Sequence, residues 1–463
     1  MYVSENSDPS IAVIHVPYGY LPDTMGGTEV YVAGLTQELQ SFGVSSFVVA
    51  AGQVADYVHE GVPVKRIPVS PNLKLEALYS DGDSEAAREF GVAVDAIKPQ
   101  VVHFHALTAS ASVAAMREAA KRRVPVVLTY HTPTVSCVRG TMLLWGRDTC
   151  DGRMIVSRCT ACALHGKGLP RLLAKLAANI PLTISRAALL RTTGRMSTVL
   201  GMRWLVNIRH RTTRAAFDIC SRVIAPCDWV FKVLAINGVP EAKIVLSRQG
   251  LSKPAMSSPV DALNRPNATG TLRLVFLGRI HPTKGLHTLL RALALLPGRH
   301  VSLDIYGARA LHDTYADLIE ALAANDSRVQ IHEPIPNEQI VATIKNYDVL
   351  VVPSEWLETG PLVIYEAFAA GVPVLGTNIG GIRELVSDGR NGRLIESGDI
   401  VAWANAMAEI ADNSALPNKW RENLPTVRTM RDVADDTQRI YREIASTVET
   451  ASQMTEKPRR HVD

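Results

Sequence analysis

The sequence predicts an α/β protein built from two doubly wound, Rossmann-like domains. Its 463 residues are too many for a single hydrophobic core. Short apolar runs alternate with helical periodicities in both halves, which is the pattern of parallel sheets covered by helices on both faces. A stretch without periodicity, residues 252–271, contains three prolines and is predicted to be a linker. Two such domains facing one another would place a ligand cleft at the carboxyl ends of both sheets.

The predicted N-terminal domain covers residues 1–251. Its first strand is Ile11–Val16, a buried apolar run that ends before Pro17. Thr28 can cap the next helix, and Gly43 would end it. The same reasoning predicts three further strands, at residues 46–51, 101–105 and 124–130. It also predicts one further helix, at residues 110–122.

The predicted C-terminal domain covers residues 272–425 and repeats the alternation. Its expected strands are residues 272–277, 301–306, 329–332, 349–353 and 372–377, and its expected helices are residues 285–296, 315–324 and 361–370. A last helix is predicted at residues 426–448. The polar, charged residues 449–463 are predicted to be a disordered tail.

Composition excludes several classes of protein. The formal net charge of +4 is small for this length, and a nucleic-acid-binding protein would be more basic. No run of 18 uncharged apolar residues is present, which argues against a membrane-spanning helix. The first ten residues are polar and lack the regions of a signal peptide. We therefore expect a cytoplasmic protein.

Four cysteines fall within 26 residues: Cys137, Cys150, Cys159 and Cys162, separated by 12, 8 and 2 residues. Four thiolates could close a tetrahedral zinc site that pins an irregular loop. Zinc sites usually pair two short knuckles, and only one Cys-x-x-Cys is present here. Structural zinc, reduced buried thiols and an iron–sulfur site therefore remain open interpretations.

A first candidate phosphate-binding segment runs from Gly278 to Gly285, directly after a predicted strand and at the start of a predicted helix. Glycines allow the backbone to approach a phosphate, and a helix N-terminus supplies amide donors and partial positive charge. Arg279 and Lys284 add two cations that would stabilise a departing nucleoside diphosphate. The alternative interpretation is a capped turn with two solvated cations.

A second segment, residues 353–371, carries two glutamates eight positions apart. Glu358 is expected in the loop at the carboxyl end of a strand, and Glu366 inside the following helix, which would start at Pro361. A carboxylate flanked by apolar residues needs a partner, and ligand hydroxyls would serve. The alternatives are an ion pair for Glu366 and a solvated loop position for Glu358.

Together these segments resemble the retaining GT-B glycosyltransferases often called family 4, or glycosyl transferases group 1. The resemblance rests on Gly-Arg-x-x-Pro-x-Lys-Gly, the Glu-x7-Glu pair, and two later stretches, and it covers essentially the whole C-terminal half. The later stretches are Gly-Val-Pro-Val at 371–374 and Gly-Gly-Ile-x-Glu-Leu-Val at 380–386. Many members have Gly-Phe-Gly where this chain has Thr359-Gly360-Pro361, so the donor sugar stays open.

The resemblance implies a role for each matching residue. Arg279 and Lys284 would bind the donor diphosphate, Glu366 the ribose hydroxyls, and Glu358 the donor sugar. Backbone around Gly360, Pro361 and Leu362 would support the sugar and phosphate. Arg279, Lys284, Glu358 and His131 are the residues expected to serve catalysis. No Asp-x-Asp motif occurs in the donor segment, so catalysis is expected to need no metal or other cofactor.

The N-terminal half carries a weaker resemblance in the same register. Gly26 and Gly27, with Glu29, look like the family's first glycine-rich loop, which approaches the donor phosphate and the reacting sugar. His131 matches a strand-end histidine that lines the family's active site, although a lone histidine there is more often structural. His103 and His105 lie on one face of another predicted strand, and we interpret them as packing or cleft-lining residues.

A basic, apolar stretch interrupts this half. Residues 152–217 hold twelve arginines and lysines and no acidic residue, and we assign residues 137–214 to a cysteine-rich basic insertion. Such a stretch can lie on an anionic membrane surface, bind an anionic acceptor, or be a solvated helical face. Since many bacterial family members act on lipid-linked acceptors, we favour peripheral contact with the inner face of a membrane. The cations expected to make it include Arg203, Arg209, Arg211 and Arg214.

The predicted function is transfer of a hexosyl group from a UDP- or GDP-sugar to a glycan or lipid-linked acceptor with retention at the anomeric carbon. Such an enzyme would fit polysaccharide biosynthesis. The rival interpretations are a sugar-nucleotide epimerase or a phosphorylase on the same fold, and a non-catalytic glycan- or lipid-binding scaffold. A scaffold has no need for Arg279, Lys284, Glu358 and Glu366 together.

Overall fold

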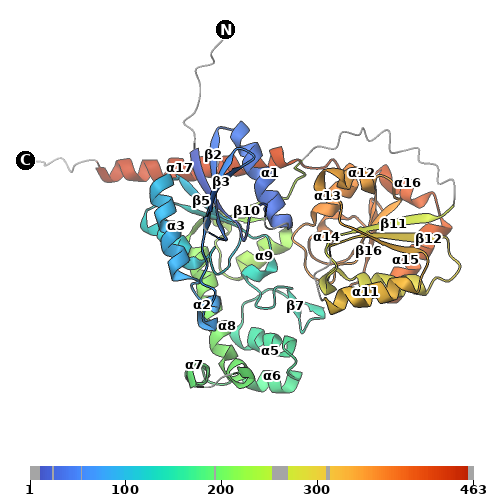
Figure 1. The fold of residues 1–463 in the computed structure, drawn as a ribbon, viewed down its shortest axis with the longest axis horizontal. Coiled ribbons are helices and arrows are strands. Elements are labelled where there is room, and N and C mark those ends of the chain that lie inside the picture. The colour runs from blue at the N-terminus through green and yellow to red at the C-terminus, as the bar shows by residue number, and fades with distance from the viewer. Residues whose placement is uncertain are drawn as a thin grey trace, which may run out of the picture. The chain divides into compact units, whose positions relative to one another are not determined.

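The computed structural model describes residues 11–22, 26–53, 55–191, 194–252, 270–308 and 313–456, with side chains up to residue 447. It divides into two compact units (Figure 1). Unit 1 comprises residues 1–226, 230–248 and 430–463, and unit 2 comprises residues 227–229 and 249–429. Most of the predicted linker, residues 253–269, lies outside the described residues, as does the end of the predicted tail, residues 457–463.

Unit 1 is built on an eight-stranded sheet in the order β10-β9-β6-β5-β1-β2-β4-β3. All neighbours pair in parallel except the β3–β4 hairpin, which is antiparallel. The strands are β1 (Ile11–Val16), β2 (Val44–Ala51), β3 (Ala55–His59), β4 (Val62–Ile67), β5 (Val101–Phe104), β6 (Val126–Thr129), β9 (Cys220–Ala225) and β10 (Ile244–Leu246). The strand order reverses its direction between β1 and β5, which makes this the topological switch point of the sheet. The carboxyl ends of strands at such a point border a crevice.

Helices cover this sheet. They are α1 (Gly27–Ser41), α3 (Ser84–Ile97), α4 (Val113–Lys121) and α9 (Asp228–Ile236), whose first two residues belong to unit 2. The short helix α2 (Leu75–Tyr79) has no buried residue. The predicted cap of α1 was wrong: the helix begins at Gly27 after Gly26, which makes no side-chain cap bond, so Thr28 lies in the first turn. Gly43 follows the helix with a φ of +74°, as its role as a terminator requires.

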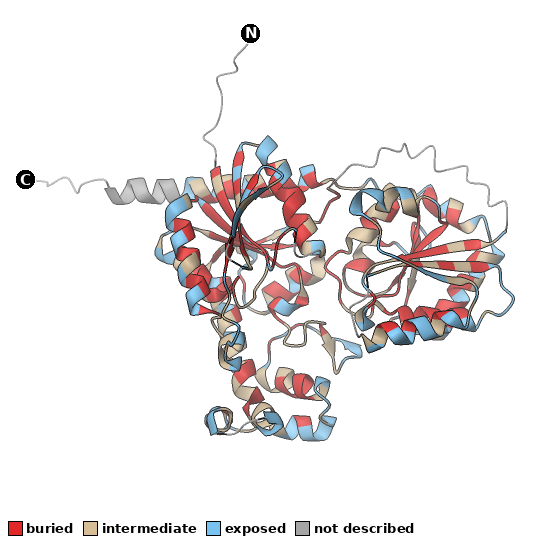
Figure 2. Cartoon of the chain, viewed as in Figure 1, coloured by how far each residue is buried: buried red, intermediate tan, exposed pale blue. Residues whose placement is uncertain are grey.

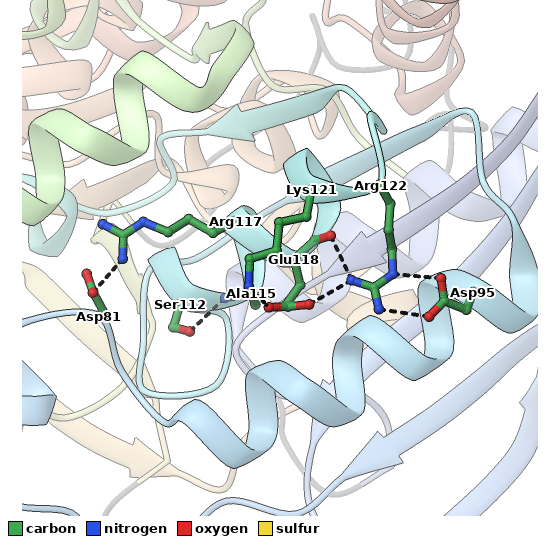
Figure 3. A network of polar contacts seen from close by, with 8 residues as sticks. All are labelled: Asp81, Asp95, Ser112, Ala115, Arg117, Glu118, Lys121 and Arg122. Carbon is green, nitrogen blue, oxygen red and sulfur yellow. Dashed lines mark hydrogen bonds and ion pairs between the residues drawn. The ribbon is translucent and has the colours of Figure 1, made fainter.

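A charged network joins α3 to α4 (Figure 3). Arg122 donates from Nε and Nη2 to the two carboxylate oxygens of Asp95, each at 2.7 Å, and from Nη1 to Glu118 at 2.7 Å. Ser112 accepts from the amide of Ala115 and so caps α4. The bidentate ion pair of Arg122 with Asp95 holds α3 and α4 against each other within unit 1.

The last helix, α17 (Met430–Glu456), returns to unit 1 rather than ending unit 2. It packs against α1 and contributes to one core with strands β1, β2, β5 and β6. Its core residues are Met430, Val433, Ala434, Ile440, Tyr441 and Ile444. The predicted helix ended at residue 448, whereas the observed helix continues to Glu456.

Between β6 and β9 the chain makes a largely helical excursion. It contains the short 3-10 helix η1 (Pro133–Val135), the hairpin β7 (Leu143–Leu144) and β8 (Asp148–Thr149), and four helices, which are α5 (Val156–Gly166), α6 (Arg171–Ala177), α7 (Leu182–Arg191) and α8 (Gly194–Ile219). Helices α5, α6 and α8 share a small apolar core of their own. The outer faces of α6 and α7 are largely exposed (Figure 2).

Unit 2 has a six-stranded, fully parallel sheet in the order β13-β12-β11-β14-β15-β16. The strands are β11 (Leu272–Leu277), β12 (Val301–Tyr306), β13 (Val329–His332), β14 (Val349–Val352), β15 (Val374–Thr377) and β16 (Gly392–Ile395). The predicted strands of this half are confirmed to within two residues, and β16 was missed. The order places the topological switch between β11 and β14, where doubly wound sheets bind their ligands.

The helices of unit 2 lie on the two faces of its sheet (Figure 1). They are α10 (Leu286–Ala294), α11 (Thr314–Ala324), α12 (Ile340–Ile344), α13 (Leu362–Ala369), α14 (Gly380–Leu385), α15 (Ile400–Asp412) and α16 (Leu416–Arg421). The central strands β11, β14 and β15 and the inner helix faces are largely buried, whereas the edge strand β13 has no buried residue (Figure 2). Two apolar clusters result, one around Trp403 and Trp420 and one around Ile364 and Phe368.

We predict that Ile444→Ala lowers the stability of unit 1 by about 3 kcal/mol, since it removes a buried side chain from the core that α17 shares with the sheet. Urea unfolding measures this. Thr447→Ala, an exposed position on the same helix, is the control and should change stability by a few tenths of a kcal/mol, about the usual size for surface sites. Equal stability of Ile444→Ala and the wild type would contradict the assignment of α17 to this core.

Candidate functional site

The loop after β11 is held close to the loop after β14 by a glycine. Gly285 ends the 3-10 helix η4 (Pro282–Lys284) with a φ of +69° and precedes α10. A Cβ at this position would lie 1.9 Å from the carbonyl oxygen of Pro353. Only glycine permits both the left-handed backbone and this approach. The amide of Glu355 donates to the carbonyl of Thr283 at 2.8 Å, which closes the two loops against each other.

Lys284 and Glu358 form an ion pair across these loops. Lys284 Nζ lies 2.6 Å from Glu358 Oε1, and the hydroxyl of Ser354 donates to the same oxygen at 2.9 Å. The Glu358 side chain is 9% exposed and that of Lys284 is 21% exposed, so water screens the pair only weakly. The sequence assigned the two residues separate tasks, whereas the structure pairs their charges and fixes the position of both.

The backbone of Glu358 is fixed as well. Its carbonyl accepts from the indole Nε1 of Trp229 at 2.8 Å and from the amide of Gly381 at 2.7 Å. The carboxylate of Glu384 accepts from the amides of Asp228 and Trp229 at 2.8 and 2.9 Å. Ser354 and Glu384 lie in the motifs quoted above, but their supporting roles were missed. Nothing in the sequence pointed to Trp229.

The start of α13 lies in the loop that follows Glu358. Gly360 has a φ of +122°, and Pro361 precedes the first helical residue, Leu362, so the helix begins one residue later than predicted. No side chain caps this helix. Its first amides and the positive end of its dipole are therefore suited to an anion. Gly381 packs here as well: a Cβ on it would lie 2.6 Å from the amide of Gly360.

Glu366 lies in the second turn of α13. Burial of its carboxyl raises the pKa of Glu366 to about 7, although the residue as a whole keeps partial exposure. No hydrogen bond or ion pair joins its side chain to the other described residues, so the predicted alternative of an intramolecular ion pair is not observed. A partly accessible carboxyl without a partner is a suitable acceptor for ligand hydroxyls.

Arg279 follows β11 and is exposed. No ion pair is recorded for it within the described part of the chain, in contrast to Lys284. Its guanidinium therefore remains available to a polyanion. The loop after β11 thus presents one exposed cation and one cation that is already held in place.

The remaining predicted residues lie in unit 1. Gly26 and Gly27 connect the loop after β1 to the first turn of α1, where Glu29 is buried; a Cβ on Gly26 would lie 2.6 Å from Glu29 Oε2. His131 lies just beyond β6 and is 7% exposed. Burial lowers the pKa of His131 to about 3, so the imidazole is neutral at physiological pH. It can then serve as a hydrogen-bonding group but not as a cation.

The four cysteines are not gathered into one metal site. Cys162 is buried on α5, and its sulfur accepts from the amide of Trp145 at 3.3 Å. Burial raises the pKa of Cys159 to about 11, and the neighbouring Cys150 and Cys137 add to that rise. Within the described ranges, the one group of three or more metal-ligand side chains with all ligand atoms inside 4.8 Å is His15, His103 and His105. Zinc coordination by all four thiolates would need their sulfur atoms to lie closer together, and the zinc site stays a prediction.

Both halves of the chain match known families. Residues 264–426 match the family described as glycosyl transferases group 1, and residues 26–171 match the glycosyl transferase 4-like domain. The chain has the GT-B fold, and its two halves are similar to these two glycosyltransferase families. The first match contains the whole β11–β14 site, and the second contains Gly26, Gly27 and His131.

Curated relatives match this chain over a limited part of their length. The chain is 34% identical over 148 residues to the D-inositol 3-phosphate glycosyltransferase of Corynebacterium glutamicum, which is 30% of this chain and 35% of that protein. It is 37% identical over 142 residues to the enzyme of the same name from Mycolicibacterium smegmatis, which is 30% of this chain and 32% of that protein. The matches thus span about a third of these relatives.

Solved structures resemble this chain over most of its length. Sucrose-phosphate synthase from Thermosynechococcus elongatus aligns with a TM-score of 0.63 and 18% identity, covering 94% of this chain and all of that one. The Anabaena protein Alr3699/HepE in complex with UDP-glucose aligns with a TM-score of 0.59 and 16% identity, covering 95% of this chain and all of that one. At such identities the likeness shows the fold.

The raised pKa of Glu366 gives a prediction about ligand binding. Ribose hydroxyls donate to a charged carboxylate, so nucleoside diphosphate affinity should weaken as the pH falls through 7, where Glu366 becomes protonated. Binding at pH 6.5 should release protons, which titration calorimetry in two buffers of different ionisation enthalpy detects. Glu366→Gln should lose both effects, and Glu338→Gln, an exposed control, should keep them. Unchanged affinity in Glu366→Gln would refute the ribose role.

The same pKa shift predicts how the stability of the protein without ligand depends on pH. Because the folded pKa lies above the unfolded value of 4.5, the stabilising contribution of Glu366 is complete below pH 4.5 and is lost as the pH rises through about 7. Glu366→Gln should therefore raise the Tm more at pH 8 than at pH 5. Differential scanning calorimetry at both values measures this, and equal shifts would contradict a raised pKa.

Proposed function

We propose that the protein transfers a hexosyl group from a UDP- or GDP-sugar to a glycan or lipid-linked acceptor, with retention at the anomeric carbon. The observation that carries the proposal is the pairing of Lys284 with Glu358 at the switch between β11 and β14, beside the unpartnered carboxyl of Glu366. Cations, helix amides and a hydroxyl acceptor are the three kinds of group that a nucleoside diphosphate sugar requires.

Each group has a proposed task in donor binding. The diphosphate would contact Arg279, Lys284 and the amides at the start of α13, while Glu366 would accept from the ribose hydroxyls. Glu358 would accept from hydroxyls of the donor sugar while it keeps Lys284 in place, since its second carboxylate oxygen is not the one that Lys284 and Ser354 contact.

Transfer would depend on stabilising the leaving group. As the bond from the sugar to the diphosphate breaks, negative charge grows on the diphosphate, and cations that are already positioned stabilise that charge without reorganising. Lys284 meets this condition, because Glu358 and the ring of Trp356, 5.8 Å from its Nζ, hold it before the donor arrives. Arg279 would add a second, more mobile charge.

The known relatives support the proposal in part. The Anabaena structure contains UDP-glucose on the same fold, which supports a nucleotide-sugar donor. The curated relatives are named as glycosyltransferases of a phosphorylated inositol, which is compatible with an anionic acceptor. The acceptor of this chain is left as a class: a glycan or a lipid-linked molecule.

We predict that Arg279→Ala and Lys284→Ala each reduce transfer about a hundredfold or more, the usual loss for one group that stabilises transition-state charge. Radiolabel transfer from UDP- and GDP-sugars measures this. Arg291→Ala removes an exposed cation from α10 outside the two loops and should leave turnover unchanged. Near wild-type turnover in both loop variants would reject the donor assignment.

The same assay separates the rival functions. An epimerase would release epimerised donor or free nucleotide in the absence of any acceptor, and a phosphorylase would carry pyridoxal phosphate, which its absorbance reveals. A scaffold would bind glycan or lipid without turnover of any nucleotide sugar.

We also propose that helices α6 and α7 contact an anionic membrane surface. Their exposed apolar side chains include Leu172, Leu176, Ile184 and Leu190, which are 57–70% exposed. Within the described chain, no single helix has the length and hydropathy of a membrane span; α6 and α7 pass such a test together but are bent by 100° to one another. Short amphipathic helices with cations between their apolar residues suit the interface of a bilayer.

The arginines expected from the sequence to contact lipid are partly used inside unit 1. Arg203 donates to the carbonyl of Ile180 at 2.8 Å, and Arg209 donates to the carbonyl of Thr134. Burial lowers the pKa of Arg209, as expected of a structural cation. Arg211 and Arg214 are exposed and stay in the proposed lipid contact, and the exposed cations Arg191 and Arg195 beside α7 join them.

We predict that the protein sediments with anionic vesicles at low salt, that zwitterionic vesicles do not bind it, and that salt releases it. Replacing Leu172, Leu173 and Leu176 by Ser should abolish sedimentation. Arg191→Gln and Arg195→Gln should each weaken it about fivefold, the equivalent of about 1 kcal/mol for a cation near the surface. Val401→Ser, an exposed apolar control in unit 2, should bind as the wild type does. Indifference of the wild type to anionic vesicles would refute membrane contact.

A further inference from the structure

Four histidines gather at the carboxyl ends of three adjacent strands of unit 1. His15 lies on β1, opposite His103 on β5, while His105 and His131 follow β5 and β6. All four are buried: His15 and His103 are 0% exposed, His105 is 1% and His131 is 7%. Of these four, the sequence predicts a catalytic task for His131 alone, so three buried imidazoles remain without an assigned task.

Three of the rings form a chain that ends at His131. His131 Nε2 lies 3.2 Å from His105 Nδ1, and His105 Nε2 lies 3.1 Å from His15 Nδ1. His15 Nε2 lies 3.4 Å from the hydroxyl of Ser46 on β2. Each contact thus joins an Nε2 of one ring to the Nδ1 of the next, in the same sense along the chain.

The fourth ring, His103, is packed against this chain but bonded elsewhere. Its Nδ1 lies 2.6 Å from the hydroxyl of Tyr441 on α17, and its Nε2 lies 2.7 Å from the hydroxyl of Thr129 on β6. Its ring centroid is 4.0 Å from that of His105. His103 therefore shares the burial and packing of the chain without being one of its links, and it provides a matched control.

The rings carry no charge under physiological conditions. Burial lowers the pKa of His15 and of His131 to about 3, and burial together with the neighbouring imidazoles lowers the pKa of His103 and His105 well below the usual value. A neutral imidazole has one N–H and one acceptor nitrogen. Each contact between two neutral rings then needs a donor on one side and an acceptor on the other.

This requirement couples the tautomers. If His131 carries its proton on Nε2 and donates to His105, then His105 must carry its own proton on Nε2, and so must His15. If His15 donates from Nδ1, the other two rings must also be protonated on Nδ1. We propose that His105, His15 and Ser46 are positioning residues that fix the tautomer and ring orientation of His131 through this chain.

The consequence concerns the far nitrogen of His131. In the first arrangement Nδ1 of His131 is an acceptor, and in the second it is a donor. The buried residues of the chain therefore set whether this nitrogen can accept a hydrogen bond from a substrate hydroxyl or donate one to it. This role rests on the proposed function, because it matters for transfer only if His131 lines the sugar site. The chain itself can be tested without any substrate.

The test is the two-bond 1H–15N spectrum of wild-type protein labelled with 15N-histidine at pH 7.5, in which the two neutral tautomers give different patterns. Single His→Phe variants at positions 15, 103, 105 and 131 assign the peaks. We expect His131, His105 and His15 to share one tautomer. Mixed tautomers among the three, or a protonated ring, would overturn the proposal. A bound metal ion that disappears in His15→Phe would also overturn it, because ligation would replace the contacts between the rings.

Kinetics then separates positioning from packing. His105→Phe breaks the chain next to His131 and should lower kcat about tenfold or more, within the range for a positioned acid–base group, with the donor KM changed less than about twofold. His103→Phe removes an equally buried ring outside the chain and should keep both kcat and the His131 spectrum. If His105→Phe and His103→Phe lose the same factor in kcat and neither changes the His131 spectrum, the histidines serve packing only and the proposal is wrong. If the wild-type spectrum shows one shared tautomer but His131→Phe keeps a normal kcat, the proposed role of His131 in transfer is rejected.

Discussion

The ion pair of Lys284 with Glu358 joins the two loops that border the switch between β11 and β14. Its formation depends on Gly285, because a side chain there would collide with the carbonyl of Pro353 and hold the loops apart. Trp229, Gly381 and Ser354 then fix Glu358 from three sides. The positions of Lys284, Glu358 and the start of α13 are thus set together. The proposed donor binding in unit 2 therefore depends on the close approach of the two loop backbones as well as on the charged side chains.

The two units hold their polar groups by different physical means. In unit 2, opposite charges are paired in a setting that water reaches poorly, and Glu366 stays without a partner at the cost of a raised pKa. In unit 1, three buried histidines, His15, His105 and His131, are neutral and are joined to one another through hydrogen bonds. A carboxyl without a partner destabilises the free protein, and this is the usual compromise where a site is shaped for a ligand rather than for stability.

The sequence was sufficient to predict the alternation of strands and helices, since buried parallel strands are continuous apolar runs. It also predicted the local positions of Lys284 in the loop after β11, Glu358 in the loop after β14 and Glu366 inside the next helix, because these positions depend only on short-range sequence patterns. It could not predict that Lys284 and Glu358 pair, which depends on loops 74 positions apart closing on one another. The return of α17 to unit 1 was also missed, because an amphipathic pattern does not say which sheet the helix covers.

The distinction between exposed and structural side chains was likewise beyond the sequence. Arg209 and Arg191 are both arginines in the same basic stretch, but Arg209 donates to a backbone carbonyl, whereas Arg191 is exposed. His103 and His105 were both expected on one strand, whereas β5 ends at Phe104 and His105 follows it, although the two rings still pack with centroids 4.0 Å apart. Their different bonding follows from Tyr441, which is 338 positions from His103. Contacts of this range are determined by tertiary packing and not by local periodicity.

The most direct test of the central claim is amide hydrogen exchange of the whole protein with and without UDP or GDP. The account predicts that a bound nucleotide slows exchange in residues 278–285, at the loop after β11, and in residues 360–366, at the start of α13. Protection confined to unit 1, or to parts of unit 2 other than these two segments, would contradict a donor site at the β11–β14 switch.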